Sequence, residues 1–104
     1  MYSAGYILSF TVQTTRAFGE WLDGLRDARA KAAVARRLKR MQAGNFGDMK
    51  PVGDGVSELR VDVGPGYRVY FVQRGQRLVV VLAGGDKSSQ DRDIQRAKAL
   101  AKEL

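Results

Sequence analysis

Three apolar segments joined by very short turns constrain the fold of this chain more than any other feature. The segments are residues 56–63, 67–73 and 77–83, and the connections are Gly64-Pro65-Gly66 and Arg74-Gly75-Gln76. Parallel neighbours need a crossover of roughly a dozen residues or more, so these turns force antiparallel pairing. The sequence therefore predicts a meander of three strands, in which residues 78–82, apolar throughout, form an interior strand.

Helical periodicity appears on both sides of this meander. A first helix is expected after Thr14 or Thr15 and before Gly24, and a second over residues 27–42 with Asp27 as its N-cap. Ser88 followed by Asp91 resembles a capping box that opens a last helix. The expected inward positions are Phe18, Trp21, Leu22 and Leu25; Ala30, Val34, Leu38 and Met41; and Ile94, Ala97 and Leu100 or Ala101.

The remaining segments complete an α+β single domain that covers residues 1–104. Residues 5–12 are expected to form an opening strand, and residues 44–55, with four glycines and a proline, a shaped loop. The element order is then β-α-α-β-β-β-α, a small antiparallel-rich sheet with an N-terminal helical hairpin and a C-terminal helix. In the first meander strand Leu59, Val61 and Val63 should face the helices. Glu58, Arg60 and Asp62 should face solvent or a ligand.

The absence of two residue types excludes several kinds of chemistry. The 104 residues contain no cysteine and no histidine. Thiolate metal sites, cysteine nucleophiles and histidine acid–base catalysis are therefore ruled out. We expect no metal and no cofactor, and any catalysis must use Lys, Arg, Tyr, Asp or Glu. The chain also contains no apolar run of the roughly 20 residues that a membrane span needs, and we expect a cytoplasmic protein.

Most of the positive charge lies on one predicted helix. The formal net charge is +7, and residues 26–43 alone sum to +6, with seven basic residues and one acidic residue. The basic residues of its outer face are Arg29, Arg36, Arg37, Lys39 and Arg40. Like charges at this spacing weaken a helix, which favours a surface that binds nucleic acid or an acidic protein partner over a merely solvated one.

A second group of cations is expected around the meander. Arg60 and Arg68 lie on adjacent predicted strands, and the short turn between them lets both side chains emerge on one face. Lys50 and Lys87 lie in the segments that precede and follow these strands. Four such cations would form a phosphate site. The alternative is that Arg60 pairs with Glu58 or Asp62 and that Arg68 only covers the sheet.

Several motifs together resemble a known family. They are Trp21-Leu22-Asp23-Gly24-Leu25, Gly44-Asn45-Phe46-Gly47-Asp48, Lys50-Pro51-Val52-Gly53-Asp54-Gly55, Glu58-Leu59-Arg60, Gly66-Tyr67-Arg68-Val69-Tyr70-Phe71 and Gly84-Gly85-Asp86-Lys87-Ser88. From about residue 18 onward the chain resembles the HigB-like addiction-module killer proteins of the RelE/ParE toxin superfamily. The expected order of elements also matches the fold of that superfamily.

The resemblance implies a toxin of a type II toxin–antitoxin module. Relatives of the RelE and HigB type cleave mRNA, usually on the ribosome, by attack of the ribose 2′-OH on the neighbouring phosphate. An antitoxin, here a helix-turn-helix protein of the HigA type, holds such toxins inactive. By position, Arg68 matches the phosphate-stabilising arginine of the family, Arg60 a second basic residue and Lys87 the basic position before the last helix; Lys50 is a looser match.

The acid–base groups of this family are not matched. Ribosome-dependent relatives carry a tyrosine or histidine near the C-terminus, where this chain has Asp91-Arg92-Asp93-Ile94. Glu58 or a lysine could act as the base, and Tyr67 or Tyr70 as the acid. The ParE branch shares the fold and inhibits DNA gyrase without cleaving RNA, so a gyrase inhibitor is the alternative function. A nucleic-acid-binding module without toxicity is a third.

Overall fold

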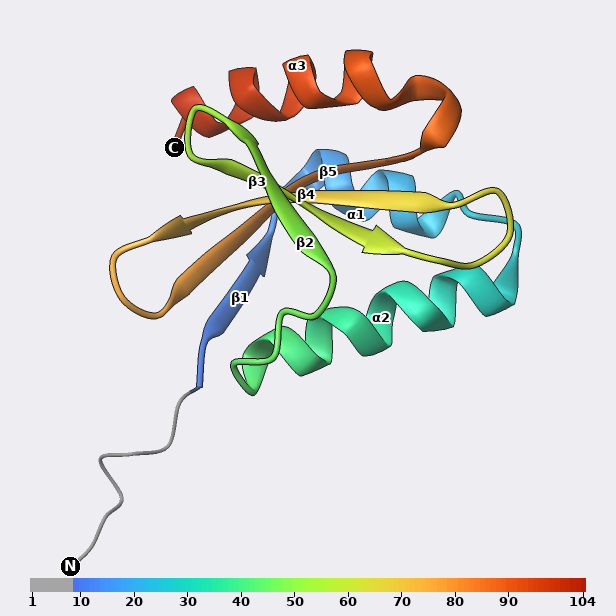
Figure 1. Ribbon diagram of the computed structural model, residues 1–104, viewed down its shortest axis with the longest axis horizontal. Coiled ribbons are helices and arrows are strands. Elements are labelled where there is room, and N and C mark those ends of the chain that lie inside the picture. Colours follow the sequence, from blue (N-terminus) through green and yellow to red (C-terminus); the bar gives the residue numbers. More distant parts are fainter. Residues whose placement is uncertain (1–8) are drawn as a thin grey trace, which may run out of the picture.

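A five-stranded sheet forms the centre of the molecule in the computed structural model, which describes residues 9–104 (Figure 1). The elements are β1 (Thr11–Thr14), α1 (Arg16–Asp23), α2 (Ala28–Gln42), β2 (Met49–Gly53), β3 (Val56–Val61), β4 (Tyr67–Arg74), β5 (Leu78–Asp86), a 3₁₀ turn η2 (Lys87–Ser89) and α3 (Gln90–Lys102). The strands lie in the order β1-β5-β4-β3-β2. The α+β class expected from the sequence is confirmed.

The meander is the antiparallel part of this sheet. Strands β3, β4 and β5 pair antiparallel in succession, as the short turns require, and β5 is an interior strand between β4 and β1. At the other side of β5, β1 adds to the sheet in parallel. Two register pairs matter for function, because β3 and β4 place Arg60 opposite Arg68 and Glu58 opposite Tyr70.

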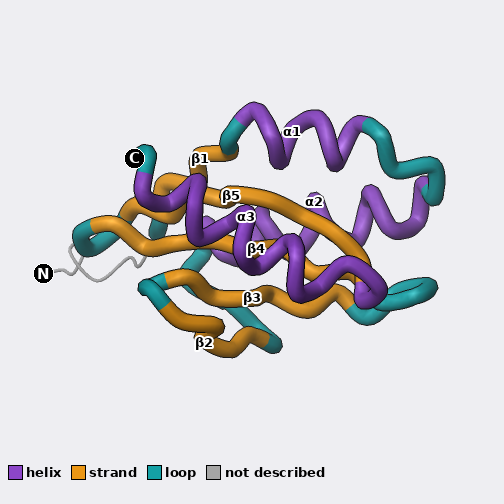
Figure 2. The backbone as a smooth tube through the Cα atoms, turned by 90° about the horizontal axis from the view of Figure 1, so that it is seen from above, coloured by secondary structure: helices purple, strands orange, loops and turns teal. Residues whose placement is uncertain are grey.

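Helices cover both faces of the sheet. In Figure 1, α2 lies below the sheet and α3 above it, and the view from above in Figure 2 shows α3 in front of the strands. One core contains Phe18 of α1 with Val34 and Met41 of α2, packed on Val69 and Val81. The opposite core contains Ala97 and Ala101 of α3. The helices in residues 9–104 are all too short or too polar to cross a membrane.

The segment expected to be a loop contains a strand. Met49–Gly53 pairs with β3, with Lys50 opposite Glu58, and adds a strand to the predicted order. Pro51 is tolerated because β2 is an edge strand, where a backbone N–H can be missing. Gly53 and Gly55, at φ 104° and 80°, form the hairpin. The glycines therefore mark the turns around β2, and the loop prediction was wrong for residues 49–53.

The second face of the meander is only partly open: Asp62 is exposed and Arg60 partly exposed, as predicted, but Glu58 is buried. Leu59 and Val61 face α1 and α2 as expected. Glu58, expected to meet solvent or a ligand, is 0% exposed because α3 packs over that side of β3 and β4. The sequence pattern of β3 alternates like that of a half-exposed strand, and it contains no sign of the helix that covers it.

The end of β5 also differs from the prediction. The strand continues through Gly84 and Gly85 to Asp86, beyond residue 83, where it was expected to end. A Cβ on Gly84 would lie 2.3 Å from Cε3 of Trp21, and one on Gly85 would lie 1.8 Å from Oδ2 of Asp93. The two glycines therefore leave room for side chains on opposite faces of the sheet, Trp21 on one and Asp93 on the other.

Three helix starts and the first strand can be compared with their expected positions. The cap of α1 is Thr15, which accepts from the Phe18 N–H at 3.1 Å, and Asp27 caps α2 as expected. The cap expected at Ser88 is wrong: Asp86 accepts from the Ser88 N–H at 2.8 Å and opens η2. The first strand is Thr11–Thr14, and residues 5–8 of the expected opening strand lie outside the described residues.

Candidate functional site

A polar cluster lies beneath the start of α3, on β3 and β4. Residues directly opposite each other in an antiparallel pair share a face, and residues two apart on one strand do so as well. The Arg60–Arg68 and Glu58–Tyr70 pairs are therefore neighbouring rows on one face. Of the four cations expected at a phosphate site, the structure brings Arg60 and Arg68 together on Glu58, and the Arg60–Glu58 contact is the pairing that the alternative predicted.

The carboxylate of Glu58 is the centre of this cluster. Its Oε1 lies 3.4 Å from Nε of Arg60 and 3.6 Å from Nε of Arg68. Its Oε2 accepts from Nε2 of Gln90 at 2.7 Å and from the Tyr70 hydroxyl at 3.4 Å. Both oxygens of a fully buried acid are thus satisfied, which is the condition under which such a charge is tolerated.

The two arginines differ in exposure. The side chain of Arg60 is 38% exposed and that of Arg68 is 14% exposed. The Arg68–Glu58 distance suits an ion pair but is too long for a hydrogen bond, and Nε of Arg68 has no hydrogen-bond partner among the described residues. The Nη1 atom of Arg68 lies close to Gly66, 3.4 Å from where a Cβ would be. The guanidinium therefore reaches toward the β3–β4 turn.

The two candidate lysines lie at the margins of the cluster. Lys50 is exposed on the edge strand β2, opposite Glu58 and therefore on the same face. Lys87 is exposed at the start of η2, and its backbone N–H donates to the carbonyl of Gly66 at 3.1 Å. The backbone of Lys87 and the guanidinium of Arg68 therefore both lie beside Gly66. Lys50 lies on the other side, beyond β3.

The two tyrosines considered as acids lie on opposite faces. Tyr70 is buried in the cluster, and its pKa is raised by burial first and then by the carboxylates of Glu58 and Asp93, with Arg68 opposing. Tyr67 packs against the other core, 6.2 Å from the ring of Trp21 between centroids. The fold separates Tyr67 from the arginines, and only Tyr70 contacts Glu58.

Two residues of α3 in this site were not predicted from the sequence. Gln90 donates to Glu58, and Asp93 fills the space above Gly85 and accepts a short hydrogen bond from the Ser89 hydroxyl. Asp93 belongs to residues 91–94, the stretch in which the sequence resemblance implied an acid–base residue but which contains no tyrosine or histidine. The signal that could have located it is Gly85, because a glycine inside a strand marks a close approach by another group.

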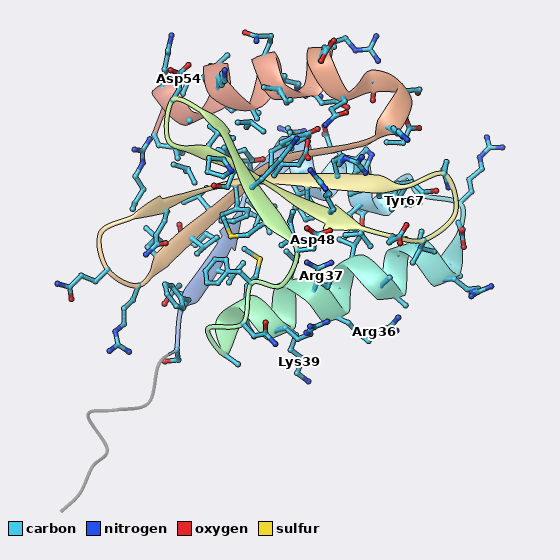
Figure 3. All side chains as sticks on the ribbon, viewed as in Figure 1. Arg36, Arg37, Lys39, Asp48, Asp54 and Tyr67 are labelled. Atoms are coloured by element: carbon cyan, nitrogen blue, oxygen red, sulfur yellow. The ribbon has the colours of Figure 1, made fainter. Side chains whose placement is uncertain are left out.

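The basic residues of α2 form a separate surface. Arg29, Arg36, Lys39 and Arg40 are exposed, and Figure 3 shows Arg36 and Lys39 extending away from the sheet. Arg37 differs, because its guanidinium turns inward toward Asp48 (Figure 3). It donates to the carbonyls of Phe46 at 3.1 Å, of Asp48 at 3.4 Å and, at short range, of Arg60.

Arg37 therefore fixes the segment before β2 and is not part of the exposed face on which it was expected. Burial lowers its pKa, as does the neighbouring Arg40, and Asp48 opposes this. An arginine remains charged under all ordinary conditions, so its role here is to hold three carbonyls in place. In residues 9–104 no group of three or more acidic side chains is placed to hold a metal ion.

The fold is that of RelE-type toxins. The chain aligns with a mutant of the E. coli toxin RelE in the free state at a TM-score of 0.65 and 12% identity, over 85% of this chain and 97% of that one. Residues 20–104 match the family described as "Phage derived protein Gp49-like (DUF891)", and the chain belongs to this family. The chain is also 53% identical over 97 residues to a protein of Haemophilus influenzae described as uncharacterized, covering 93% of this chain and 98% of that protein.

Proposed function

We propose that this chain is the toxin of a type II toxin–antitoxin module and cleaves translated mRNA without a metal ion. The observation that carries the proposal is the pairing of Arg60 and Arg68 across β3 and β4, held in place by one buried carboxylate. Membership in the Gp49-like family and the RelE-type fold support it. The narrower HigB-like assignment remains a prediction from the sequence motifs.

In this proposal the arginines stabilise charge that develops on the phosphate. The ribose 2′-oxygen attacks the adjacent phosphorus, the bond to the 5′-oxygen breaks, and one proton is transferred overall from the 2′-oxygen to the 5′-oxygen. The products are a 2′,3′-cyclic phosphate and a 5′-OH. A cation whose position is fixed before the reaction stabilises the five-coordinate intermediate without reorganisation. Arg68, packed at the β3–β4 turn, has this property.

Glu58 is better suited to positioning than to proton transfer. Its carboxylate is fully buried and already engaged by Arg60, Arg68, Tyr70 and Gln90. A general base must reach the proton that it removes. We therefore propose that Glu58 holds the arginines, and that the exposed Lys50 and Lys87 contact the RNA phosphates on either side.

A translation extract tests the activity. The purified chain is added to an extract that translates a defined message, and primer extension locates new 5′ ends. The expected result is cleavage that depends on translation of the message. A gyrase supercoiling assay is run in parallel with the same preparation. Inhibition of supercoiling with intact mRNA would contradict the proposal and support the ParE-like alternative.

The proposed partner is an antitoxin encoded beside the toxin, expected to be a small helix-turn-helix protein. Induced expression of the chain alone should arrest bacterial growth, and co-expression of the neighbouring gene should restore it. Normal growth while soluble, folded protein accumulates would contradict the toxin assignment.

A further inference from the structure

The outward face of α2 is a line of positive charge without internal compensation. The helix Ala28–Gln42 contains no acidic residue. Arg29, Arg36, Lys39 and Arg40 are exposed, and none of these four side chains makes an ion pair or hydrogen bond within residues 9–104. Arg36 and Arg40, one turn apart, repel each other. An anionic partner on this face would remove that repulsion.

The N-terminal half of this face also contains an apolar hollow. It encloses about 390 Å³ and is lined by Ala28, Ala32 and Val63, with Arg29 and Arg36 beside them. The two arginines are seven residues apart, two helical turns or about 10.5 Å. The alanines, four residues apart, have the smallest side chains that a helix tolerates well. A second backbone can therefore approach α2 closely between two positively charged side chains.

We propose that this hollow binds an acidic amphipathic helix of a partner protein. Such a helix would place small or medium apolar side chains over Ala32 and Val63, and carboxylates against Arg29 and Arg36. RNA fits this surface less well, because the lining provides no aromatic ring on which a base could stack, and phosphates gain nothing from an apolar floor. Charge and shape together favour a protein.

This surface is independent of the candidate site. Helix α2 packs on the core that contains Phe18 and Val69, whereas Arg60, Arg68 and Glu58 lie on the face covered by α3. Figure 1 shows α2 and α3 on opposite sides of the sheet. The inference therefore does not rest on the proposed nuclease activity.

A designed peptide serves as the probe. It is a labelled helix of about 18 residues, roughly five turns, with glutamates spaced seven residues apart and leucine or valine between them. Binding is measured by fluorescence anisotropy at several salt concentrations. A peptide of the same composition in scrambled order and a single-stranded RNA oligonucleotide are measured alongside it. The designed peptide should bind at least about tenfold more tightly than the scrambled one.

Variants of the chain locate the binding. Arg29→Glu with Arg36→Glu should weaken binding of the designed peptide by about tenfold or more. Arg96→Glu with Lys102→Glu makes the same change in net charge on exposed positions of α3 and should change binding less than about threefold. Ala32→Gln keeps the charge but fills the hollow, and should also weaken binding. Circular dichroism checks that each variant is folded.

Three results would overturn the inference. The first is equal weakening by the two double variants, which would show that only net charge is sensed. The second is unchanged binding to the Ala32→Gln variant. The third is RNA that binds more tightly than the peptide and loses its binding in the Arg29→Glu and Arg36→Glu variant.

Discussion

Arg60 and Arg68 lie directly opposite each other on neighbouring strands, an arrangement that repels unless something compensates for it. Glu58 supplies the compensation, because one of its oxygens lies within 3.6 Å of both guanidinium Nε atoms. The dependence is mutual, since a buried carboxylate is tolerated only with such partners. The same three side chains therefore stabilise the fold and hold two cations on one face.

Glu58→Gln tests this mutual dependence at the level of stability. The amide keeps the shape of the side chain and removes the charge that both arginines need. We expect a loss of roughly 2–4 kcal/mol in the free energy of unfolding, less than for a fully buried pair because Arg60 is partly exposed. Urea denaturation measures it. Glu20→Gln, at an exposed pair with Arg16, should change stability by less than about 1 kcal/mol.

The raised pKa of Tyr70 predicts that the stability of the fold decreases at alkaline pH. Burial and nearby carboxylates raise its pKa above the ordinary value of about 10. Above that pH the unfolded chain loses the phenolic proton while the folded chain keeps it, so the free energy of unfolding must fall as pH rises. The fall should be smaller in Tyr70→Phe. A difference between wild type and variant that stays constant from about pH 8 to 11 would contradict this.

At the scale of elements, the contact between α1 and β5 depends on a glycine. Gly84→Ala would place a methyl group 2.3 Å from the Trp21 ring, so the helix must shift. We expect a loss of about 1–3 kcal/mol in the free energy of unfolding, measured by urea denaturation. Gly19 lies in α1, and a Cβ at this position would have no neighbouring atom within 4 Å. Gly19→Ala should therefore raise the free energy of unfolding by up to about 1 kcal/mol. Equal stability of the two variants would refute the contact.

The elements that the sequence could predict are those whose local pattern agrees with their environment. Helix α2 has a capping Asp27 and an apolar stripe, and β3 to β5 have turns that permit only one connection. Strand β2 could not be predicted, because its pairing with β3 outweighs a local composition typical of loops.

The site could be predicted only in part, because some of its contacts are set by packing between elements that are far apart in the sequence. The short turn places Arg60 beside Arg68, and this follows from the sequence. The burial of Glu58 and the inward turn of Arg37 depend on which helix packs on which face. Gln90 and Asp93 reach the cluster from a helix far away in the sequence, so no local pattern identifies them.

At the scale of the whole molecule, the positive charge divides between two opposite sides of the sheet. One side has Arg60 and Arg68 under the start of α3, with Lys50 and Lys87 at its margins, and the other has the exposed face of α2. A single flat partner cannot cover both. We propose separate roles for these two groups of cations, and only the first is proposed to meet the scissile phosphate.

The central claim is that Arg68 stabilises the phosphate during cleavage, and primer-extension mapping of mRNA from cells that express matched levels of variants tests it most directly. Arg68→Ala should reduce cleavage by about 10²–10³-fold, and Arg68→Lys should restore it only in part, because an ammonium lacks the bidentate fork. Arg96→Ala, on the exposed side of α3, should cleave like wild type. Undiminished cleavage by folded Arg68→Ala would contradict the account.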